Sequence, residues 1–218
     1  MTTTMKAKPK TKAKSSRSTF TGVKKLIPKV VEVKEDVPLR IDIGCGKNKR
    51  QDGKWVGLDE IAFEGVDFVL DAGKDRWPFE DESVTEAYAS HFVEHLVPNQ
   101  RIHFVNELYR VMKKPKYDNG KLLEGMATII VPHWASQRAY GDLTHAWPPV
   151  SEFWFYYLDK EWRAVNAPHN LLYTCDFNCS WGYNEHHELN GRNIEYKQHA
   201  MKFWKEACTD TIAYFYKK

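Results

Sequence analysis

Short apolar segments recur between residues 39 and 132, each bounded by glycine, aspartate, serine or proline. They lie at 39–43, 54–59, 66–71, 84–90 and 126–132. Residues of these types commonly mark strand ends. The segments are apolar on both faces more than they alternate, which is typical of buried parallel strands. The pattern therefore predicts five strands of one parallel sheet.

A helical pattern separates the fourth and fifth segments. Over 98–114 the apolar residues Ile102, Val105, Leu108 and Met112 recur at intervals of three or four. Pro98 suits the first turn of a helix. Strands that alternate with such crossovers predict an α/β sheet, with ligands at the carboxyl ends of its strands.

Beyond Pro132 the pattern is less regular. Residues 147–162 predict a loop and a short aromatic helix, in which 153–158 supplies core packing. Residues 170–181 and 209–217 predict two late strands. We expect them to be antiparallel, because no long helical pattern clearly separates a parallel pair.

Composition narrows the class of protein. The 218 residues include 8 Trp, 11 Tyr and 11 Phe, enough aromatic side chains for one domain with a full core. No apolar run approaches the roughly 18 residues of a membrane-spanning helix, which excludes an integral membrane protein. The 4 cysteines are too few for a disulfide scaffold. They fit a reducing compartment, so we expect a cytoplasmic protein.

Charge divides the chain into two parts. Residues 1–30 hold nine lysines or arginines and no acid, whereas residues 31–218 hold 23 basic and 29 acidic residues. Residues 1–35 are expected to form a disordered basic tail, and 36–218 the folded domain. The tail could bind nucleic acid or a ribosome, act as a nuclear address, serve as a transit peptide, or only solubilise the chain.

The most informative segment is 41–49, which reads Ile-Asp-Ile-Gly-Cys-Gly-Lys-Asn-Lys. Gly44 and Gly46 follow a predicted strand, and glycine lets backbone approach a ligand closely. The dinucleotide fingerprint G-x-G-x-x-G requires glycine at position 49, which here is Lys49. This departure counts against a nicotinamide enzyme.

Three carboxylates stand at the ends of consecutive predicted strands: Asp42, Asp59 and Asp71. Neighbouring strands of a sheet lie about 5 Å apart, so we expect all three to line one rim. Such a rim suits a ligand with an ammonium group, a ribose diol and an exocyclic amine, each a hydrogen-bond donor. S-adenosylmethionine carries all three groups.

The ordered motifs DIGCG, GLD, LDAG, ELYRVMKK and a strand ending in VP resemble those of class I S-adenosylmethionine-dependent methyltransferases. The chain is similar in particular to a small group with a GCG…GLD opening and a D-x-T-H loop, here Asp142–His145. The resemblance covers residues 39–155. It implies a Rossmann-like sheet, mostly parallel with an antiparallel C-terminal strand and helices on both faces.

The resemblance also implies the cofactor, S-adenosyl-L-methionine, and the residues that bind it. Gly44 and Gly46 would adjoin its methionine part and Asp42 its ammonium group. Asp59 would bind the ribose, and Asp71 with Ala72 the adenine. Ser90 and His91 would lie near the sulfonium.

Two features depart from the family pattern. Asn48 replaces the usual third glycine, and only twelve residues separate Gly46 from Asp59. We therefore expect the first crossover helix to be short or missing.

The loop after the fifth strand carries aromatic and titratable residues, and we expect it to open on the cofactor rim. They are His133, Trp134, Arg138, Tyr140, Asp142, His145 and Trp147. This predicts an acceptor pocket with His145 or His133 as general base, together with Asp142. The alternative is a polar loop that only shields the sheet.

The acceptor itself is not identified by the sequence. The fourth strand ends in Ala89-Ser90-His91, which lacks the Asn/Asp-Pro-Pro-Tyr/Phe motif of amino-methylating nucleic-acid enzymes and the Pro-Cys of cytosine C5 enzymes. A small molecule, sugar or protein is slightly favoured. A second hypothesis is a non-catalytic methyltransferase-fold protein that docks on nucleic acid through residues 1–30.

Two patterns resemble metal sites, but we expect no metal. His91-x-x-Glu94-His95 spells a zinc-peptidase signature, whose histidines need one helical face, whereas His91 falls at a strand end. Cys175 and Cys179, with His186, His187 and Cys208 downstream, could form a zinc knuckle, but in a strand the first pair would lie about 13 Å apart. Cys45 is interpreted as a small buried apolar residue.

Overall fold

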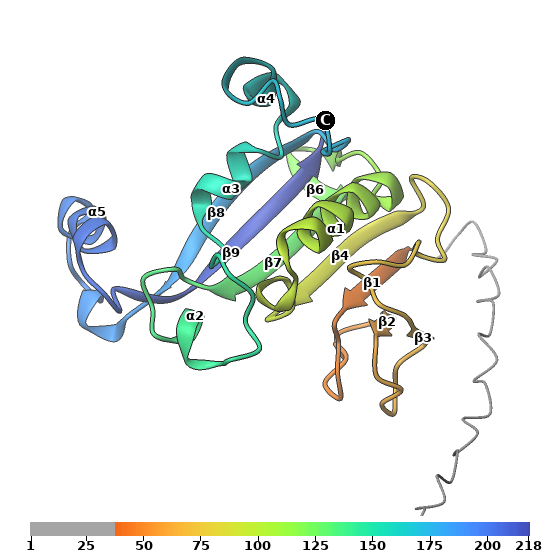
Figure 1. Cartoon of the computed structure of the whole chain (residues 1–218), viewed down its shortest axis with the longest axis horizontal. Helices are drawn as coiled ribbons and strands as arrows, with labels where there is room; N and C mark the ends of the chain where they lie inside the picture. Colours follow the sequence, from red (N-terminus) through yellow and green to blue (C-terminus); the bar gives the residue numbers. More distant parts are fainter. Residues whose placement is uncertain (1–37) are drawn as a thin grey trace, which may run out of the picture.

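The computed structural model describes residues 38–218, so the predicted basic tail and its boundary at residue 35 lie outside the described residues. Seven strands form one sheet (Figure 1). They are β1 Leu39–Ile43, β2 Val56–Asp59, β3 Phe68–Val69, β4 Val84–Ser90, β7 Met126–Pro132, β8 Phe177–Glu185 and β9 Cys208–Lys217. A second, two-stranded sheet pairs β5 Lys116–Asp118 with β6 Lys121–Glu124.

The order of the large sheet is β3-β2-β1-β4-β7-β9-β8. The pairs from β3 to β7 are parallel, and β9 lies antiparallel between β7 and β8. This confirms the expected Rossmann-like sheet, mostly parallel with an antiparallel C-terminal strand. The two late strands are antiparallel to each other, as predicted, although β8 begins later than the pattern indicated.

Helices connect the later strands. The longest is α1 Pro98–Val111, which joins β4 to β7 through the β5–β6 hairpin and confirms the predicted helix. The others are α2 Arg138–Gly141, α3 Glu152–Tyr156, α4 Lys160–Asn166 and α5 Ile194–Phe203, with short 3-10 helices η1 Val93–His95 and η2 His187–Leu189. Of the helices in residues 38–218, none is long and apolar enough to cross a membrane.

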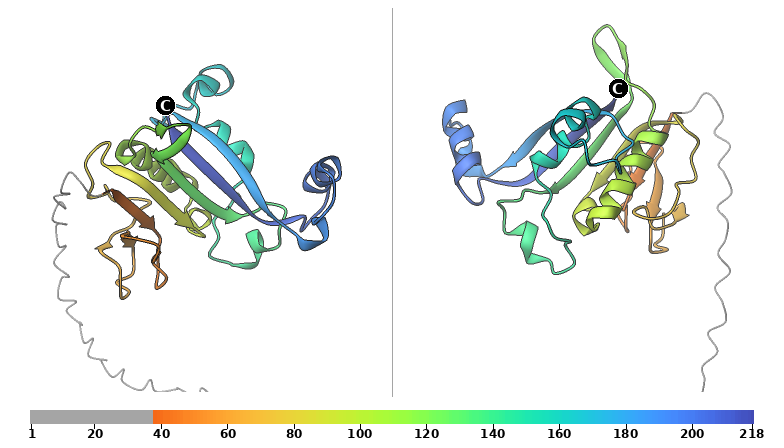
Figure 2. Two further views of the ribbon diagram at one scale, coloured as in Figure 1. Left: turned by 180° about the vertical axis from the view of Figure 1, so that it is seen from behind. Right: turned by 45° about the horizontal axis from the view of Figure 1, so that its top comes forward.

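The core lies on one face of the large sheet. Ile43, Ala89 and Ile129 are fully buried there with Phe104 of α1 and Phe155 of α3. In the middle of β4, β7 and β9 the residues that alternate with them, such as Tyr88, Thr128 and Tyr214, are only partly buried. Figure 2 shows these strands from behind, with α1 and α3 on their far side.

The first three connections of the large sheet carry no helices. Within the described part of the chain, the connections from β1 to β4, residues 44–55, 60–67 and 70–83, contain no helix. They consist of turns, bends and irregular segments in place of crossover helices. The expectation that the first crossover helix would be short or missing is therefore confirmed.

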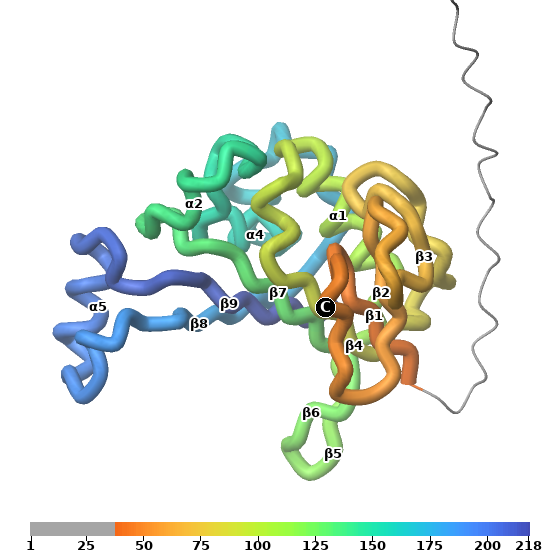
Figure 3. Tube along the Cα trace, turned by 90° about the horizontal axis from the view of Figure 1, so that it is seen from below, coloured from red at the N-terminus to blue at the C-terminus, as the bar shows by residue number. Residues whose placement is uncertain are grey.

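Two segments project from the body of the sheet. The β5–β6 hairpin extends from one side, and α5 lies beyond the far ends of β8 and β9 (Figure 3). α5 packs through Ala200 against a small separate cluster with Leu189 and Ala207. Neither segment reaches the carboxyl ends of β1 and β2.

Candidate active site

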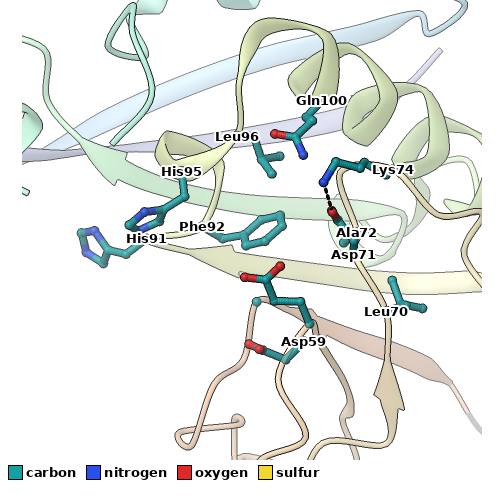
Figure 4. Close-up of a pocket in the computed structure, with 12 residues that line it drawn as sticks. Asp59, Leu70, Asp71, Ala72, Lys74, His91, Phe92, His95, Leu96 and Gln100 are labelled. Carbon is teal, nitrogen blue, oxygen red and sulfur yellow. Dashed lines mark hydrogen bonds and ion pairs between the residues drawn. The ribbon is translucent and has the colours of Figure 1, made fainter. Parts of the chain in front are cut away.

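A cavity of about 270 Å³ opens at the carboxyl ends of the parallel strands. Strand register brings these ends together, because Ile43 of β1 pairs with Leu58 of β2 and with Ala89 of β4. Figure 4 shows the side chains that line the cavity. They are Gly44, Asp59, Glu60, Leu70, Asp71, Ala72, Lys74, His91, Phe92, His95, Leu96 and Gln100.

The glycine turn after β1 forms one wall. Gly44 and Gly46 have φ of +66° and +53°, in the left-handed region that favours glycine. A Cβ at Gly44 would lie 2.8 Å from Phe92 Cβ, whereas a Cβ at Gly46 would meet no atom within 4 Å. Gly44 is therefore required by packing, and Gly46 leaves open space beside the turn.

Asp59 and Asp71 both reach the cavity, as the sequence predicted. Asp59 Oδ2 accepts a hydrogen bond from the Gly46 amide at 2.8 Å, which ties the end of β2 to the glycine turn. Asp71 accepts from the Gly73 amide at 3.0 Å and pairs with Lys74 Nζ at 2.6 Å. A carboxylate has about four acceptor positions, so both keep capacity for a ligand.

Asp42 does not join them. Ile41 and Ile43 are buried in the core, so the alternation of β1 directs Asp42 to the opposite face. There it is 4% exposed and accepts a hydrogen bond from the Arg50 amide at 2.8 Å. Burial raises the pKa of Asp42, partly offset by that hydrogen bond. The predicted rim of three carboxylates is thus a rim of two.

Of the two candidate cofactor-binding residues at the end of β4, only His91 lines the cavity. Ser90 alternates with Ala89, which is buried in the core, and Ser90 does not line the cavity. His91 does line it, with a left-handed φ of +53° that is unusual for histidine. A hydrogen bond with Glu94, 3.1 Å from His91 Nδ1, raises the pKa of His91.

The D-x-T-H loop reaches this site through His95. Asp142 Oδ1 accepts from the Thr144 hydroxyl at 2.7 Å, and Thr144 Oγ1 lies 3.0 Å from His95 Nδ1. The hydrogen bond from the Thr144 hydroxyl lowers the pKa of Asp142. His145 packs edge-to-face on His95, with ring centroids 4.8 Å apart. Asp142 and His145 therefore stand beside the cavity.

His133 lies in a different place. It is 2% exposed, its Nε2 is 3.1 Å from Glu152 Oε1, and it lines a second cavity of about 500 Å³ between α3, β8 and α5. The wall of that cavity also holds Tyr183, whose pKa burial raises to about 12. The two base candidates thus lie apart: His133 lines this second cavity, and His145 lies beside the first, against His95.

The rest of the predicted acceptor loop is partly structural. Arg138 pairs with buried Asp210 of β9 at 2.8 Å, and Tyr140 donates to the Trp134 carbonyl at 2.8 Å. Trp147 is exposed. These contacts fix the loop beside the carboxyl end of β7 and the amino end of β9, so it both shields the sheet and presents side chains.

Several cavity residues were not predicted. Phe92 and Leu96 form an apolar wall, and Gln100 lies in the first turn of α1, where its side chain accepts from the Val97 amide at 3.0 Å. Glu60 follows Asp59 directly. Apolar residues and residues within a helix match no chemical sequence motif. The spatial arrangement alone therefore identifies these cavity-lining residues.

The cysteines are all free. Cys45 is buried, as interpreted from the sequence, and burial raises its pKa to about 11. Cys175 precedes β8 and Cys179 lies within it. The two cysteines therefore do not share one strand, which the sequence-based distance of about 13 Å assumed. In the described region, no group of three potential ligands includes a cysteine.

Comparison with known proteins supports the fold. No family model and no curated protein matches the chain. A SAM-dependent methyltransferase from Archaeoglobus fulgidus matches in structure with 18% identity and a TM-score of 0.57, covering 84% of this chain and 87% of that one. The chain thus has the fold of the class I methyltransferases.

Two further structures resemble it more distantly. The 1,6-didemethyltoxoflavin-N1-methyltransferase of Burkholderia thailandensis has 11% identity and a TM-score of 0.47, covering 83% of this chain and 72% of that one. The geranyl diphosphate C-methyltransferase of Streptomyces coelicolor has 12% identity and a TM-score of 0.46, covering 83% and 73%. The Archaeoglobus protein, with its TM-score of 0.57, is the match that supports the fold.

Proposed function

We propose that the protein is an S-adenosyl-L-methionine-dependent methyltransferase. The observation that carries this proposal is the cavity at the carboxyl edge of the sheet, with the Gly44–Gly46 turn at one end and Asp59 and Asp71 along its rim. In open α/β sheets, ligands bind at this edge. A sulfonium cofactor with an adenosyl group supplies donors that match both carboxylates.

Each wall of the cavity matches one part of the cofactor. Asp59 accepts hydrogen bonds from the ribose hydroxyls, and Asp71 with Ala72 contacts the adenine. The open space beside Gly46 admits the methionine part, for which a side chain would be an obstacle. We assign His91, which lines the cavity, to the side of the sulfonium. Asp42 and Ser90 act at most indirectly, because their side chains lie outside the cavity.

Methyl transfer is an in-line displacement. The acceptor's electron pair forms a bond to the methyl carbon while the sulfur–carbon bond breaks and its electrons return to sulfur. The protein must hold the acceptor atom about 3 Å from that carbon. A hydroxyl or amide acceptor must also lose a proton. His145 is the better placed of the two base candidates, since it adjoins His95 at the cavity.

The acceptor class stays as the sequence indicates: a small molecule, sugar or protein rather than a nucleobase amine. His95 is exposed and lines one side of the cavity, where its imidazole can reach an acceptor. A polar acceptor that hydrogen-bonds to imidazole fits this side. A purely apolar acceptor does not.

Calorimetric titration of the full chain with S-adenosylmethionine and S-adenosylhomocysteine tests the proposal. We expect one binding site in the native protein and no measurable binding after Asp59→Ala. The matched control is Glu64→Gln, which changes an exposed carboxylate between β2 and β3 that does not line the cavity. Normal binding by a folded Asp59→Ala protein would refute the assignment.

A further inference from the structure

Three side chains from two distant segments converge beside the cavity. Glu94 and His95 belong to η1, after β4, and His145 belongs to the loop after β7. One potential ligand atom from each lies within 4.8 Å of the others. A hydrogen bond from the Ala146 amide to the Glu94 carbonyl, 2.8 Å long, holds the two segments together.

Glu94 carries an unpartnered oxygen. The residue is 4% exposed, and its Oε1 lies 3.1 Å from His91 Nδ1. Its Oε2 has no hydrogen-bond partner. Among the buried side-chain nitrogen and oxygen atoms of residues 38–218, it is the one without a partner. The nearby guanidinium of Arg101 bonds backbone carbonyls, not this carboxylate. A buried carboxylate oxygen without a partner is costly, so a bound cation would stabilise it.

The hydrogen bonds of His95 determine which of its nitrogens is free. Thr144 donates its hydroxyl proton to Asp142 Oδ1 at 2.7 Å, so Thr144 Oγ1 accepts from His95 Nδ1 at 3.0 Å. His95 Nδ1 therefore carries the proton, and its Nε2 has a free lone pair. A ring oriented in this way by a polar group is typical of metal-ligating histidines.

His145 is oriented by the backbone. Its Nδ1 lies 3.2 Å from the Ala139 carbonyl oxygen, which can only accept, so this nitrogen carries the proton and Nε2 has the lone pair. The D-x-T-H pattern thereby gains a physical meaning. Asp142 and Thr144 orient one histidine, and the fourth residue of the pattern supplies another.

We propose that Glu94, His95 and His145 bind one divalent transition-metal ion at the edge of the cavity. Two imidazole nitrogens and one carboxylate oxygen suit Zn²⁺, Fe²⁺, Co²⁺ or Mn²⁺. The site differs from the zinc-peptidase pattern considered in the sequence: Glu94 is a ligand here, and His91 is bonded to it instead of joining the group.

The role of the ion rests on the proposed methyltransferase function. His95 is exposed and lines the cavity, so coordination positions stay open toward a molecule bound there. A metal ion lowers the pKa of a bound hydroxyl and fixes its oxygen. The acceptor class would then be a molecule with a hydroxyl or other oxygen donor. His145 would act as a metal ligand, since its free lone pair cannot also serve as a base.

Cobalt titration tests the binding directly. The tag-free full chain, freed of metal with a chelator, is titrated with Co²⁺ while visible absorption and binding heat are recorded. We expect one equivalent to bind, with at least a tenfold loss of affinity in His145→Asn and in Glu94→Gln. The matched control is His187→Asn, from an exposed group of three potential ligands at His186, His187 and Glu188.

Thr144→Val provides a second measurement that removes no ligand. It removes the group that orients His95, so we expect about a tenfold weaker Co²⁺ affinity with unchanged stoichiometry. If Glu94→Gln does not fold, Thr144→Val still tests the proposed metal site. Absence of a stoichiometric site would overturn the proposal, as would binding that His145→Asn leaves intact or that His187→Asn abolishes.

S-adenosylhomocysteine binding in excess chelator separates this proposal from the proposed function. If the cofactor product binds but Co²⁺ does not, the metal site is wrong and the methyltransferase stands. If Co²⁺ binds as described but the cofactor product does not, the metal site stands and its assigned role falls.

Discussion

Gly44 and Gly46 have different surroundings, although they belong to one sequence motif. Both have positive φ, which costs a residue with a Cβ roughly 1 kcal/mol. Only Gly44 is also crowded, because the Phe92 side chain occupies the place of its Cβ. Phe92 in turn packs on Phe104 of α1, with ring centroids 5.8 Å apart. Gly44 thus packs against Phe92 and also lines the cavity, whereas Gly46 faces open space beside the turn.

Alanine substitution separates the two roles. We expect Gly44→Ala to lower the free energy of unfolding by about 3 kcal/mol, from backbone strain plus overpacking against Phe92. Gly46→Ala should cost about 1 kcal/mol, since nothing meets its Cβ, yet it should weaken S-adenosylhomocysteine binding. Urea unfolding and calorimetry measure the two effects. Equal losses of stability would contradict this division.

Sequence reasoning located the site residues that stand at strand ends and missed those that depend on orientation. Asp59 and Asp71 were found because strand ends mark the ligand edge. Asp42 was misplaced, because position along a strand does not fix which face is the core until the sheet is assembled. The partnership of Glu94 and His95 with His145 spans about fifty residues, and no local pattern encodes such a distance.

At the scale of elements, α1 holds the segment that follows β3. Glu107 Oε2 accepts from the Trp77 amide at 2.8 Å, and Arg110 bonds both Glu107 and the carbonyls of Trp77 and Phe79. Trp77 donates from its indole to the Ala72 carbonyl at 3.0 Å. A helix on the core face therefore supports the wall of the cavity assigned to adenine.

Through this network the free energy of unfolding depends on pH in the acidic range. Burial alone would raise the pKa of Glu107, but hydrogen bonds from Arg110 and the Trp77 amide outweigh it and hold the pKa below its usual value. Because the folded pKa lies below the unfolded one, the stabilisation is complete above about pH 4.3 and is lost as pH falls through the folded pKa.

We expect Glu107→Gln to destabilise the protein by roughly 3 kcal/mol at pH 7, since Arg110 loses its buried partner. The difference from the native protein should shrink below about pH 4. Urea unfolding between pH 7 and pH 3 measures it, with the exposed Glu64→Gln as control. A difference that stays constant over this range would exclude Glu107 as a source of the pH dependence.

The elements themselves were predictable where their burial is regular. α1 and the strands β1, β2, β4, β7 and β9 follow from periodicity, since each packs on the core. The β5–β6 hairpin was missed despite Asn119-Gly120, both at positive φ, which is a strong hairpin signal. α5 was missed because Ala200 is its one buried residue, so it shows no apolar stripe.

For the whole molecule, the strand order could not be derived from local pattern. The insertion of β9 between β7 and β8 depends on pairings between distant segments, such as Ile130 with Ile212. Resemblance to a known family supplied a mostly parallel sheet with an antiparallel C-terminal strand, but not this order. The residues alone supplied the strands, the helix over 98–114 and the short aromatic helix. The absence of helices between β1 and β4 was foreseen only in part, from the short connection between β1 and β2.

Basic and acidic residues are distributed unevenly along the whole chain. Nine basic residues lie in 1–30, and the remainder is acidic by six charges. Counterion release makes binding to nucleic acid steeply dependent on salt, with a slope of about 0.7 per neutralised phosphate on single strands. We therefore expect the full chain to bind single-stranded RNA of arbitrary sequence at low salt, with affinity falling steeply as salt rises.

The matched variant replaces those nine basic residues with glutamine and keeps the chain length. Its RNA affinity should be lost at all salt concentrations, because the remaining acidic domain repels phosphate. Lys116→Gln with Lys121→Gln, on the exposed β5–β6 hairpin, is the control and should bind as the native chain does. Fluorescence anisotropy from 20 to about 300 mM salt measures both slopes. Equal slopes for the native and glutamine-substituted chains would show that the basic segment only solubilises the protein.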